Sequence, residues 1–161
     1  MERNVHIETL GQLHLVGIRV RCPGEAYVLK IPLVAKQLDE RKKEIAHVLN
    51  LPYQIGAFVV ETSSEEEEGY WVCYQVKKIE NVPDGMVAIT VPSQSYAVMK
   101  HQGSNKNILH TYEELHHWIE KSGSKRKLGA WHLERFYHYE DTEQIEVDLL
   151  DTIQDKSKEM M

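Results

Sequence analysis

The sequence predicts an α+β fold in which two βαββ repeats, related by pseudo-twofold symmetry, form an antiparallel sheet with two helices and a central pocket. The order strand, helix, strand, strand occurs twice along the chain. A Gly-Ala-aromatic string at Gly56 returns at Gly129, an offset of 73 residues. Each repeat alone is too small to bury its sheet face, so the two are expected to pair, with the pocket at their junction.

The chain of 161 residues suits one domain, which we expect over residues 1–153 with repeats at about 5–80 and 86–153. Hydrophobic residues make up 42% and charged residues 27%, which are ordinary globular values. Residues 154–161 are polar without periodicity, so they are expected to form a disordered tail.

In the first half, residues 5–20 mix apolar and polar residues in rough alternation, which predicts a strand closed by Pro23 and Gly24. Residues 33–49 carry apolar positions at helical spacing and predict an amphipathic helix. Pro32, just ahead of this run, suits the first helical turn. The apolar positions of this helix are Val34, Leu38, Ile45, Val48 and Leu49.

The next segments are β-prone. Residues 54–62 and 70–79 predict a hairpin, and the polar stretch 63–69 predicts its acidic loop. Residues 86–101 resume extended character, interrupted by Pro92, which indicates an edge or a bend.

The second half repeats this order. An apolar stripe predicts a helix that ends near Ser122 and Gly123. Residues 128–139 and 144–153 then predict a second hairpin. The stripe consists of Ile108, Tyr112, Leu115 and Ile119.

Charge and composition exclude several classes of protein. The net charge of -6 repels phosphate backbones, so direct nucleic-acid binding is not expected. No apolar run approaches the ~20 residues of a membrane span, and the start lacks the apolar core of a secretory signal, so we expect a cytoplasmic protein without a membrane partner. Cys22 and Cys73 form no CxxC motif and are expected to be reduced, structural thiols.

The residues suggest no metal or cofactor. Nine histidines are present, but no pair has chelating spacing: His116 and His117 point about 100° apart on a helix, and His132 and His138 are roughly 20 Å apart on a strand. A lone axial histidine for haem stays open. Motifs for a catalytic serine or cysteine and Gly-rich phosphate loops are absent from the sequence.

Four motifs together resemble a known family. They lie at residues 11–17, at 91–103, in Thr-Tyr-x-x-Leu-x-x-Trp over 111–118, and in Glu134-Arg135-Phe136. Their ordered set resembles the GyrI-like, AraC-type effector-binding family, which includes the ligand domains of regulators such as BmrR and Rob. The resemblance covers about residues 5–153, and it implies a stand-alone member, since no helix-turn-helix segment accompanies it. The family's Glu-x-Tyr is Glu-x-Phe here.

The resemblance implies a small-molecule binding protein for effectors or multiple drugs, with amphipathic cationic compounds as ligands, acting by sensing or sequestration in transcription regulation or in drug and toxin resistance. Two alternatives stay open. One is a hydrolase of reactive electrophilic natural products, with Glu134 as general base and Tyr112 assisting. The other is a gyrase-inhibitor-like module that binds a protein partner, either a regulator or a topoisomerase. The chain is expected to be a monomer or a homodimer.

The candidate ligand-binding residues are Glu134, Phe136, Trp71 and Tyr112. The resemblance implies that Glu134 is the acidic anchor at the pocket floor and that aromatic residues supply cation–π surface. Trp71 and Phe136 lie on the central strands of the two hairpins, and Tyr112 lies on the helix stripe that faces the sheet. Glu61 is the repeat equivalent of Glu134 at the 73-residue offset and is expected at a solvated strand end.

Ordinary structural roles compete with each of these assignments. Glu134 as an exposed strand residue would pair with Arg135 or a lysine, and the aromatic residues would serve as core. The acidic run 65–68 is either a docking site for a basic partner or a solvated loop.

Overall fold

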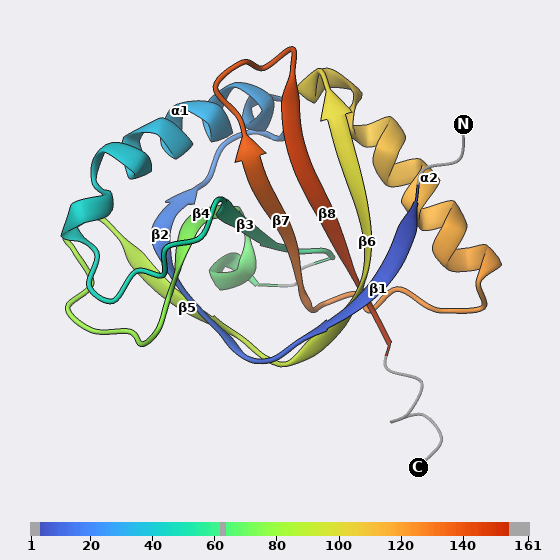
Figure 1. The fold of residues 1–161 in the computed structure, drawn as a ribbon, viewed down its shortest axis with the longest axis horizontal. Coiled ribbons are helices and arrows are strands. Elements are labelled where there is room, and N and C mark those ends of the chain that lie inside the picture. Colours follow the sequence, from blue (N-terminus) through green and yellow to red (C-terminus); the bar gives the residue numbers. More distant parts are fainter. Residues whose placement is uncertain (1–3, 62–63, 155–161) are drawn as a thin grey trace.

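The computed structural model describes residues 4–61 and 64–154 (Figure 1). The tail expected over residues 154–161 lies outside the described residues except for Gln154, whose backbone N–H donates to the Lys125 carbonyl at 2.8 Å. Within the described ranges, no helix combines the length and apolar character needed to cross a membrane.

One antiparallel sheet of eight strands forms the body of the molecule, in the order β1-β6-β8-β7-β3-β4-β2-β5. The strands are β1 (Val5–Leu10), β2 (Leu13–Val20), β3 (Gln54–Val59), β4 (Tyr70–Val76), β5 (Val87–Val91), β6 (Gln94–Gly103), β7 (Trp131–His138) and β8 (Ile145–Ile153). The helices are α1 (Tyr27–Glu40) and α2 (Ile108–Lys121), preceded by the short 3₁₀ turns η1 (Gly24–Ala26) and η4 (Asn105–Asn107). The α+β class is therefore confirmed.

The two halves are related by pseudo-twofold symmetry. β2 and β6 begin at residues 13 and 94, and α1 and α2 begin at residues 27 and 108, so both pairs are 81 residues apart. α1 packs against β2 and β4, and α2 packs against β6. In Figure 1 the two helices lie on either side of the central strands, with the curved sheet beneath them. The symmetry axis passes between β3 and β7, the strands that join the halves.

The strand register corrects the repeat offset of 73 residues. Ile18 and Met99 are equivalent at an offset of 81 residues, and a row of paired residues runs across the sheet from each of them. The first row is Ile18, Val72 and Gly56, and the second is Met99, Leu149 and Glu134. Gly56 is therefore the structural equivalent of Glu134, and the two pair with each other across the axis. The Gly-Ala match gives the wrong offset because its two glycines are not equivalent: Gly129 lies in the turn before β7, whereas Gly56 lies inside β3. Glu61, expected as the equivalent of Glu134, is an exposed residue just after β3 with φ of 57°.

The first helix lies earlier than predicted, at residues 27–40 instead of 33–49. Pro32 is inside it rather than ahead of it. The apolar residues that seemed to continue the helix belong to a segment that runs back along β4. There Val48 bridges Val76, and the Leu49 N–H donates to the Gln75 carbonyl at 2.9 Å.

The expected strand over residues 5–20 is two strands, β1 and β2, which separate at Gly11 and Gln12. β1 pairs with β6 at one end of the sheet, and β5 pairs with β2 at the other. β1 precedes β2 in the sequence but extends the half of the sheet that contains β6. β5 precedes β6 in the sequence but extends the half that contains β2. The bend expected at Pro92 is confirmed, because β5 ends before it and β6 begins after it.

Three apolar clusters form the core. One lies beneath α1 and one beneath α2, and the third covers the sheet face that points away from the helices.

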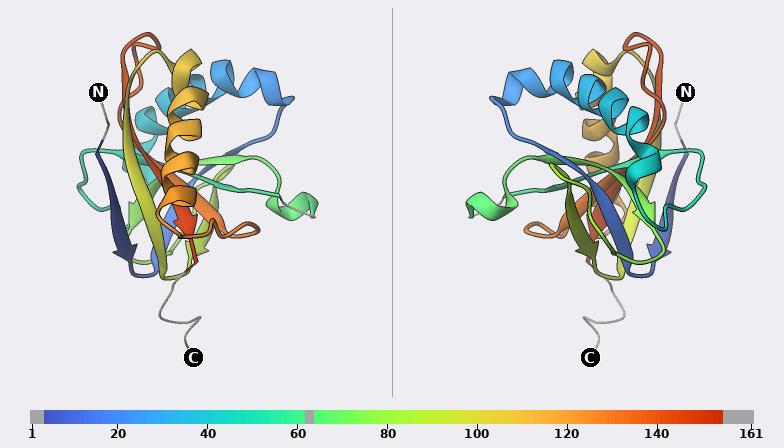
Figure 2. Two further views of the ribbon diagram at one scale, coloured as in Figure 1. Left: turned by 90° about the vertical axis from the view of Figure 1, so that its right-hand side faces the viewer. Right: turned by 90° about the vertical axis from the view of Figure 1, so that its left-hand side faces the viewer.

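The β3–β4 hairpin, which carries the acidic 3₁₀ turn η3 (Glu65–Glu67), projects from the body (Figure 2). Arg19 holds the hairpin by donating to the carbonyls of Glu65 and Glu68. Both cysteines are free, and burial raises the pKa of the Cys73 thiol.

Candidate functional site

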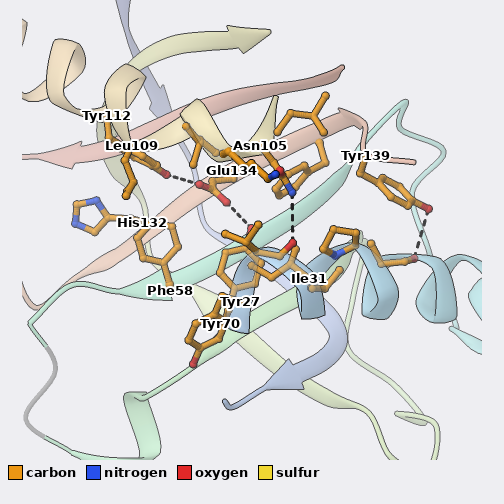
Figure 3. A pocket seen from close by; sticks show the side chains of 18 of the residues that line it. Tyr27, Ile31, Phe58, Tyr70, Asn105, Leu109, Tyr112, His132, Glu134 and Tyr139 are labelled. Carbon is orange, nitrogen blue, oxygen red and sulfur yellow. Dashed lines mark hydrogen bonds between the residues drawn. The ribbon is translucent and has the colours of Figure 1, made fainter. Parts of the chain in front are cut away.

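A cavity of about 470 Å³ lies between the two helices and the central strands (Figure 3). Its walls come from both halves of the molecule, so it lies where the symmetry predicts a pocket. The aromatic residues that line it are Tyr27, Phe58, Tyr70, Tyr112, Phe136 and Tyr139. The charged or titratable residues that line it are Lys106, His116, Arg126, His132, Glu134 and Asp151, besides these tyrosines.

The pair Gly56 and Glu134 is one departure from the symmetry in the cavity floor. Phe58 lies opposite His132 and Phe136 lies opposite Gln54 in the β3–β7 ladder, so the two phenylalanines are equivalent and line the cavity from both halves. The second half carries Glu134 where the first carries Gly56. A Cβ on Gly56 would lie 1.7 Å from the Tyr70 hydroxyl oxygen, so Tyr70 fills the space that the glycine leaves.

Tyr70 and Tyr112 bind the two oxygens of the Glu134 carboxylate. The Tyr70 hydroxyl donates to Oε1 at 2.5 Å, and the Tyr112 hydroxyl donates to Oε2 (Figure 3). Glu134 itself is only 5% exposed. Within residues 4–61 and 64–154, no arginine, lysine or histidine forms an ion pair with it. Among the described residues, the carboxylate therefore has hydrogen-bond donors but no neutralising cation.

Burial dominates the protonation of this group. It raises the pKa of Glu134 above its ordinary value, although the hydrogen bonds from Tyr112 and Tyr70 favour the charged form and oppose the shift. Burial, together with the nearby carboxylate, raises the pKa values of both tyrosines well above their usual range. Both phenols thus stay protonated and remain donors.

The shifted pKa predicts a pH-dependent stability. Because the folded state holds the Glu134 proton more tightly than the unfolded state, its contribution to the free energy of unfolding decreases as pH rises from 4.5 through the raised pKa. Glu134→Gln removes this decrease. Urea unfolding at a series of pH values should show the variant gaining stability relative to the wild type between pH 4 and pH 7. A difference that stays constant over this range would contradict the assignment.

The structure brings together three of the four predicted ligand-binding residues. Glu134, Tyr112 and Phe136 all line the cavity, but Trp71 does not. Trp71 lies on the opposite face of the sheet, edge-on to Trp131 and beneath the Arg19 guanidinium. Side chains alternate along a strand, so the inward orientation of Tyr70 sends Trp71 outward.

Trp71→Phe should therefore change stability without changing ligand binding. The indole is 3% exposed in the core on the far face, and its replacement by a smaller ring leaves unfilled volume there. We expect a lower melting temperature and an affinity for an amphipathic cation, the class of ligand that the sequence predicts, within about twofold of the wild type. Calorimetric titration measures the affinity without relying on tryptophan fluorescence. A clear loss of affinity in a folded variant would contradict the assignment of Trp71 to the far face.

A second polar cluster that the sequence does not predict lies against the cavity. Asp151 on β8 is 1% exposed and lies 2.6 Å from His132 Nδ1, 2.7 Å from His116 Nε2 and 2.9 Å from Arg126 Nε. Although burial acts to raise the pKa of Asp151, contacts with His116, His132 and Arg126 hold it below its usual range. Two sequence patterns could have predicted part of this cluster. Alternation along the strand places His132 on the same face as Glu134, and a spacing of four residues places His116 on the same helix face as Tyr112. Neither pattern predicts that Asp151 or Arg126 belongs to the cluster. Among the described residues, no three His, Cys, Asp or Glu side chains are placed to hold a metal ion.

Pro32 leaves a carbonyl of α1 free for a contact between the two halves at the cavity wall. Proline has no N–H, so the Val28 carbonyl lacks the helical donor it would have received from residue 32. The Asn105 side-chain amide donates to this carbonyl at 3.3 Å, across the gap between the two halves (Figure 3). The hydrogen bond links the start of α1 to the turn that precedes α2.

A largely apolar cavity with a few convergent polar groups, formed between two halves of a sheet, is typical of a small-molecule-binding domain. The chain belongs to the GyrI-like small molecule binding domain family, whose model matches residues 3–150. No curated protein matches the chain.

Several solved structures share the fold. SAV2435 bound to tetraphenylphosphonium is 16% identical with a TM-score of 0.70, and the match covers 96% of each chain. The C-terminal domain of EcmrR is 14% identical with a TM-score of 0.70, and the match covers 96% of this chain and 99% of that one. A hydrolase encoded by lin2189 from Listeria innocua is 14% identical with a TM-score of 0.56, over 95% and 93% of the chains.

Proposed function

We propose that this protein is a stand-alone binding protein for amphipathic, cationic small molecules. Glu134 supplies the charge that attracts the ligand, and Tyr112 and Phe136 supply aromatic wall. The proposal is carried by one observation: a buried carboxylate with two tyrosine donors lies at the floor of an aromatic cavity, and no cation in the part of the chain that the structure describes neutralises it.

A bound cation would relieve the cost of this arrangement. A buried carboxylate is expensive in the absence of a partner, and hydrogen bonds offset only part of the lost hydration. A cation in the cavity would interact with Glu134 at low dielectric and with the faces of the surrounding rings. A neutral ligand of the same shape would gain the contacts with the walls but not the charge interaction.

The comparisons support the choice of probe. A protein of the same fold, SAV2435, has been solved with tetraphenylphosphonium bound, and this ion is a lipophilic cation of the class we propose. The likeness to a regulator's C-terminal domain agrees with a role in sensing for transcription regulation, and sequestration in drug or toxin resistance would use the same pocket. We propose that the protein acts in the cytoplasm without binding nucleic acid directly.

Calorimetric titration of the wild type with tetraphenylphosphonium and with uncharged triphenylphosphine oxide tests the proposal. We expect saturable binding of one cation per cavity and at least about tenfold weaker binding of the oxide, because the oxide lacks the Coulomb interaction with the Glu134 carboxylate. The mass of the ligand after incubation should be unchanged. Equal binding of both compounds, or no binding of either, would contradict the proposal.

The Tyr112–Glu134 contact also keeps hydrolysis as a second candidate. A carboxylate beside a tyrosine hydroxyl can act as general base and assisting donor for attack by water on an electrophile. Both oxygens of Glu134 accept from tyrosines, so a water would first have to displace one of these donors. Incubation with an electrophilic alkylating compound, followed by mass analysis, distinguishes turnover from binding.

A further inference from the structure

We propose that the cavity contains a second subsite, formed by Arg126 and His116, that binds an acidic group of the ligand. This inference rests on the proposed function and narrows it. The preferred ligands would be amphipathic zwitterions, with a cationic part at Glu134 and a carboxylate at Arg126.

Arg126 has unused donors at the cavity wall. Its Nε donates to the buried Asp151 Oδ2 at 2.9 Å, which fixes the orientation of the guanidinium group. The two terminal nitrogens have no hydrogen-bond partner among residues 4–61 and 64–154. The side chain lines the cavity and is 29% exposed. A guanidinium fixed by one carboxylate can accept a second one through the donors that remain.

His116 places this subsite beside the first. It follows Tyr112 by one helical turn on α2, and the two rings lie 5.8 Å apart between centroids. Tyr112 donates to Glu134, and His116 Nε2 lies 2.7 Å from Asp151 Oδ2. One face of α2 therefore contacts both acidic groups, so a single small molecule can reach Glu134 and Arg126 together.

The fold itself does not require this cluster. The equivalent positions in the first half hold uncharged residues. Tyr74 is the equivalent of Asp151, Gln54 of His132 and Ala35 of His116. In that uncharged set, Gln54 donates to the Ala35 carbonyl at 3.0 Å and the Tyr74 hydroxyl donates to Asp39 at 2.7 Å. Among the lining residues that the structure describes, only those of the second half present a guanidinium and an imidazole to the cavity.

Asp151 orients this subsite without blocking it. At 1% exposure it is covered by its three partners, whereas Arg126 and His116 are 29% and 34% exposed on the cavity side of the cluster. An acidic ligand group would therefore meet the terminal N–H donors of the Arg126 guanidinium first. A buried carboxylate that holds a cationic side chain in place acts in the same way as the partners that orient ligating groups in other sites.

Two matched phosphonium probes test the proposal. (Carboxybutyl)triphenylphosphonium carries a carboxylate on a flexible tether, and its methyl ester has the same cation without the negative charge. The wild type should bind the acid about tenfold tighter than the ester, as expected for a charge-assisted pair. Arg126→Gln should bring this ratio to about one, and Arg126→Lys should retain part of it. Arg21→Gln, at an exposed arginine, makes the same change of charge and should keep the full ratio.

A Glu134→Gln variant separates this inference from the proposed function. It should weaken both phosphonium probes by the same factor and leave their ratio unchanged. A wild type that binds both probes equally, or an Arg126→Gln variant that keeps the preference, would overturn the anionic subsite while leaving the cation site intact.

A second pair of probes tests the subsite without any cation. Anilinonaphthalene sulfonate is an anion, and N-phenylnaphthylamine is its uncharged parent. Arg126→Gln should weaken the sulfonate several-fold and leave the amine unchanged, which also shows that the cavity is still folded. If no phosphonium binds the wild type, the proposed function fails. The subsite then stands only if the sulfonate binds in this Arg126-dependent manner, and an equal effect on both compounds overturns it.

Discussion

Replacing Glu134 with glutamine is expected to weaken the binding of tetraphenylphosphonium by about 1.5–3 kcal/mol, roughly tenfold to a hundredfold, because the Coulomb interaction between the cation and the carboxylate is lost. Glutamine has nearly the same shape and can still meet the hydroxyls of Tyr70 and Tyr112. Triphenylphosphine oxide should bind the variant and the wild type equally. Calorimetric titration of both compounds gives the two affinities.

Glu61→Gln is the matched control for this experiment. It makes the same chemical change and the same change in net charge at an exposed position just after β3, outside the cavity. It should leave both affinities unchanged. If Glu134→Gln weakens the cation and the oxide by equal factors, the effect is one of shape, and the charge does not hold the ligand.

Replacing Gly56 with alanine is expected to damage both stability and binding. The new Cβ would lie 1.7 Å from the Tyr70 hydroxyl oxygen and 2.3 Å from its ring carbon Cζ, so the ring has to move. Overpacking of this kind costs about 1–3 kcal/mol of unfolding free energy. The displaced hydroxyl no longer donates to Glu134, and the affinity for tetraphenylphosphonium should decrease as well. Denaturant unfolding and calorimetric titration measure the two effects.

A double-mutant cycle identifies the cause. In a Tyr70→Val background the clash is absent, so Gly56→Ala should cost much less stability there than in the wild type. Gly11→Ala is the neutral reference, since among the described residues no atom beyond its chain neighbours lies within 4 Å of its added Cβ. An equal cost of Gly56→Ala in both backgrounds would show that Tyr70 is not what the glycine accommodates.

Local patterns predict much of the fold. The stripe from Ile108 to Ile119 predicts α2 because its spacing continues for three turns, and the second hairpin follows from alternation between turn signals. The first helix is misplaced because Pro32 favours an N-terminal position statistically, whereas here Asn105, distant in sequence, satisfies the carbonyl that a proline inside the helix leaves free. A contact of that kind has no local signal.

Local patterns also predict part of the candidate site. Alternation along one strand places Glu134 and Phe136 on the same face, and the structure keeps them together. The face of Trp71 could not be assigned, because the sequence does not fix which of two alternating sets on β4 points toward the helices. The role of Gly56 depends on the register between β3 and β7, and the Asp151 cluster depends on pairing between β8 and its neighbours.

The proposed function requires that the bound cation is attracted by the negative charge of the Glu134 carboxylate. Carbon-13 NMR of the Glu134 side-chain carboxyl, followed through a pH titration with and without tetraphenylphosphonium, tests it most directly. Binding and ionisation are linked reciprocally, so saturating cation should shift the raised pKa of Glu134 downward. A Glu134 titration that the bound cation leaves unchanged would contradict the account.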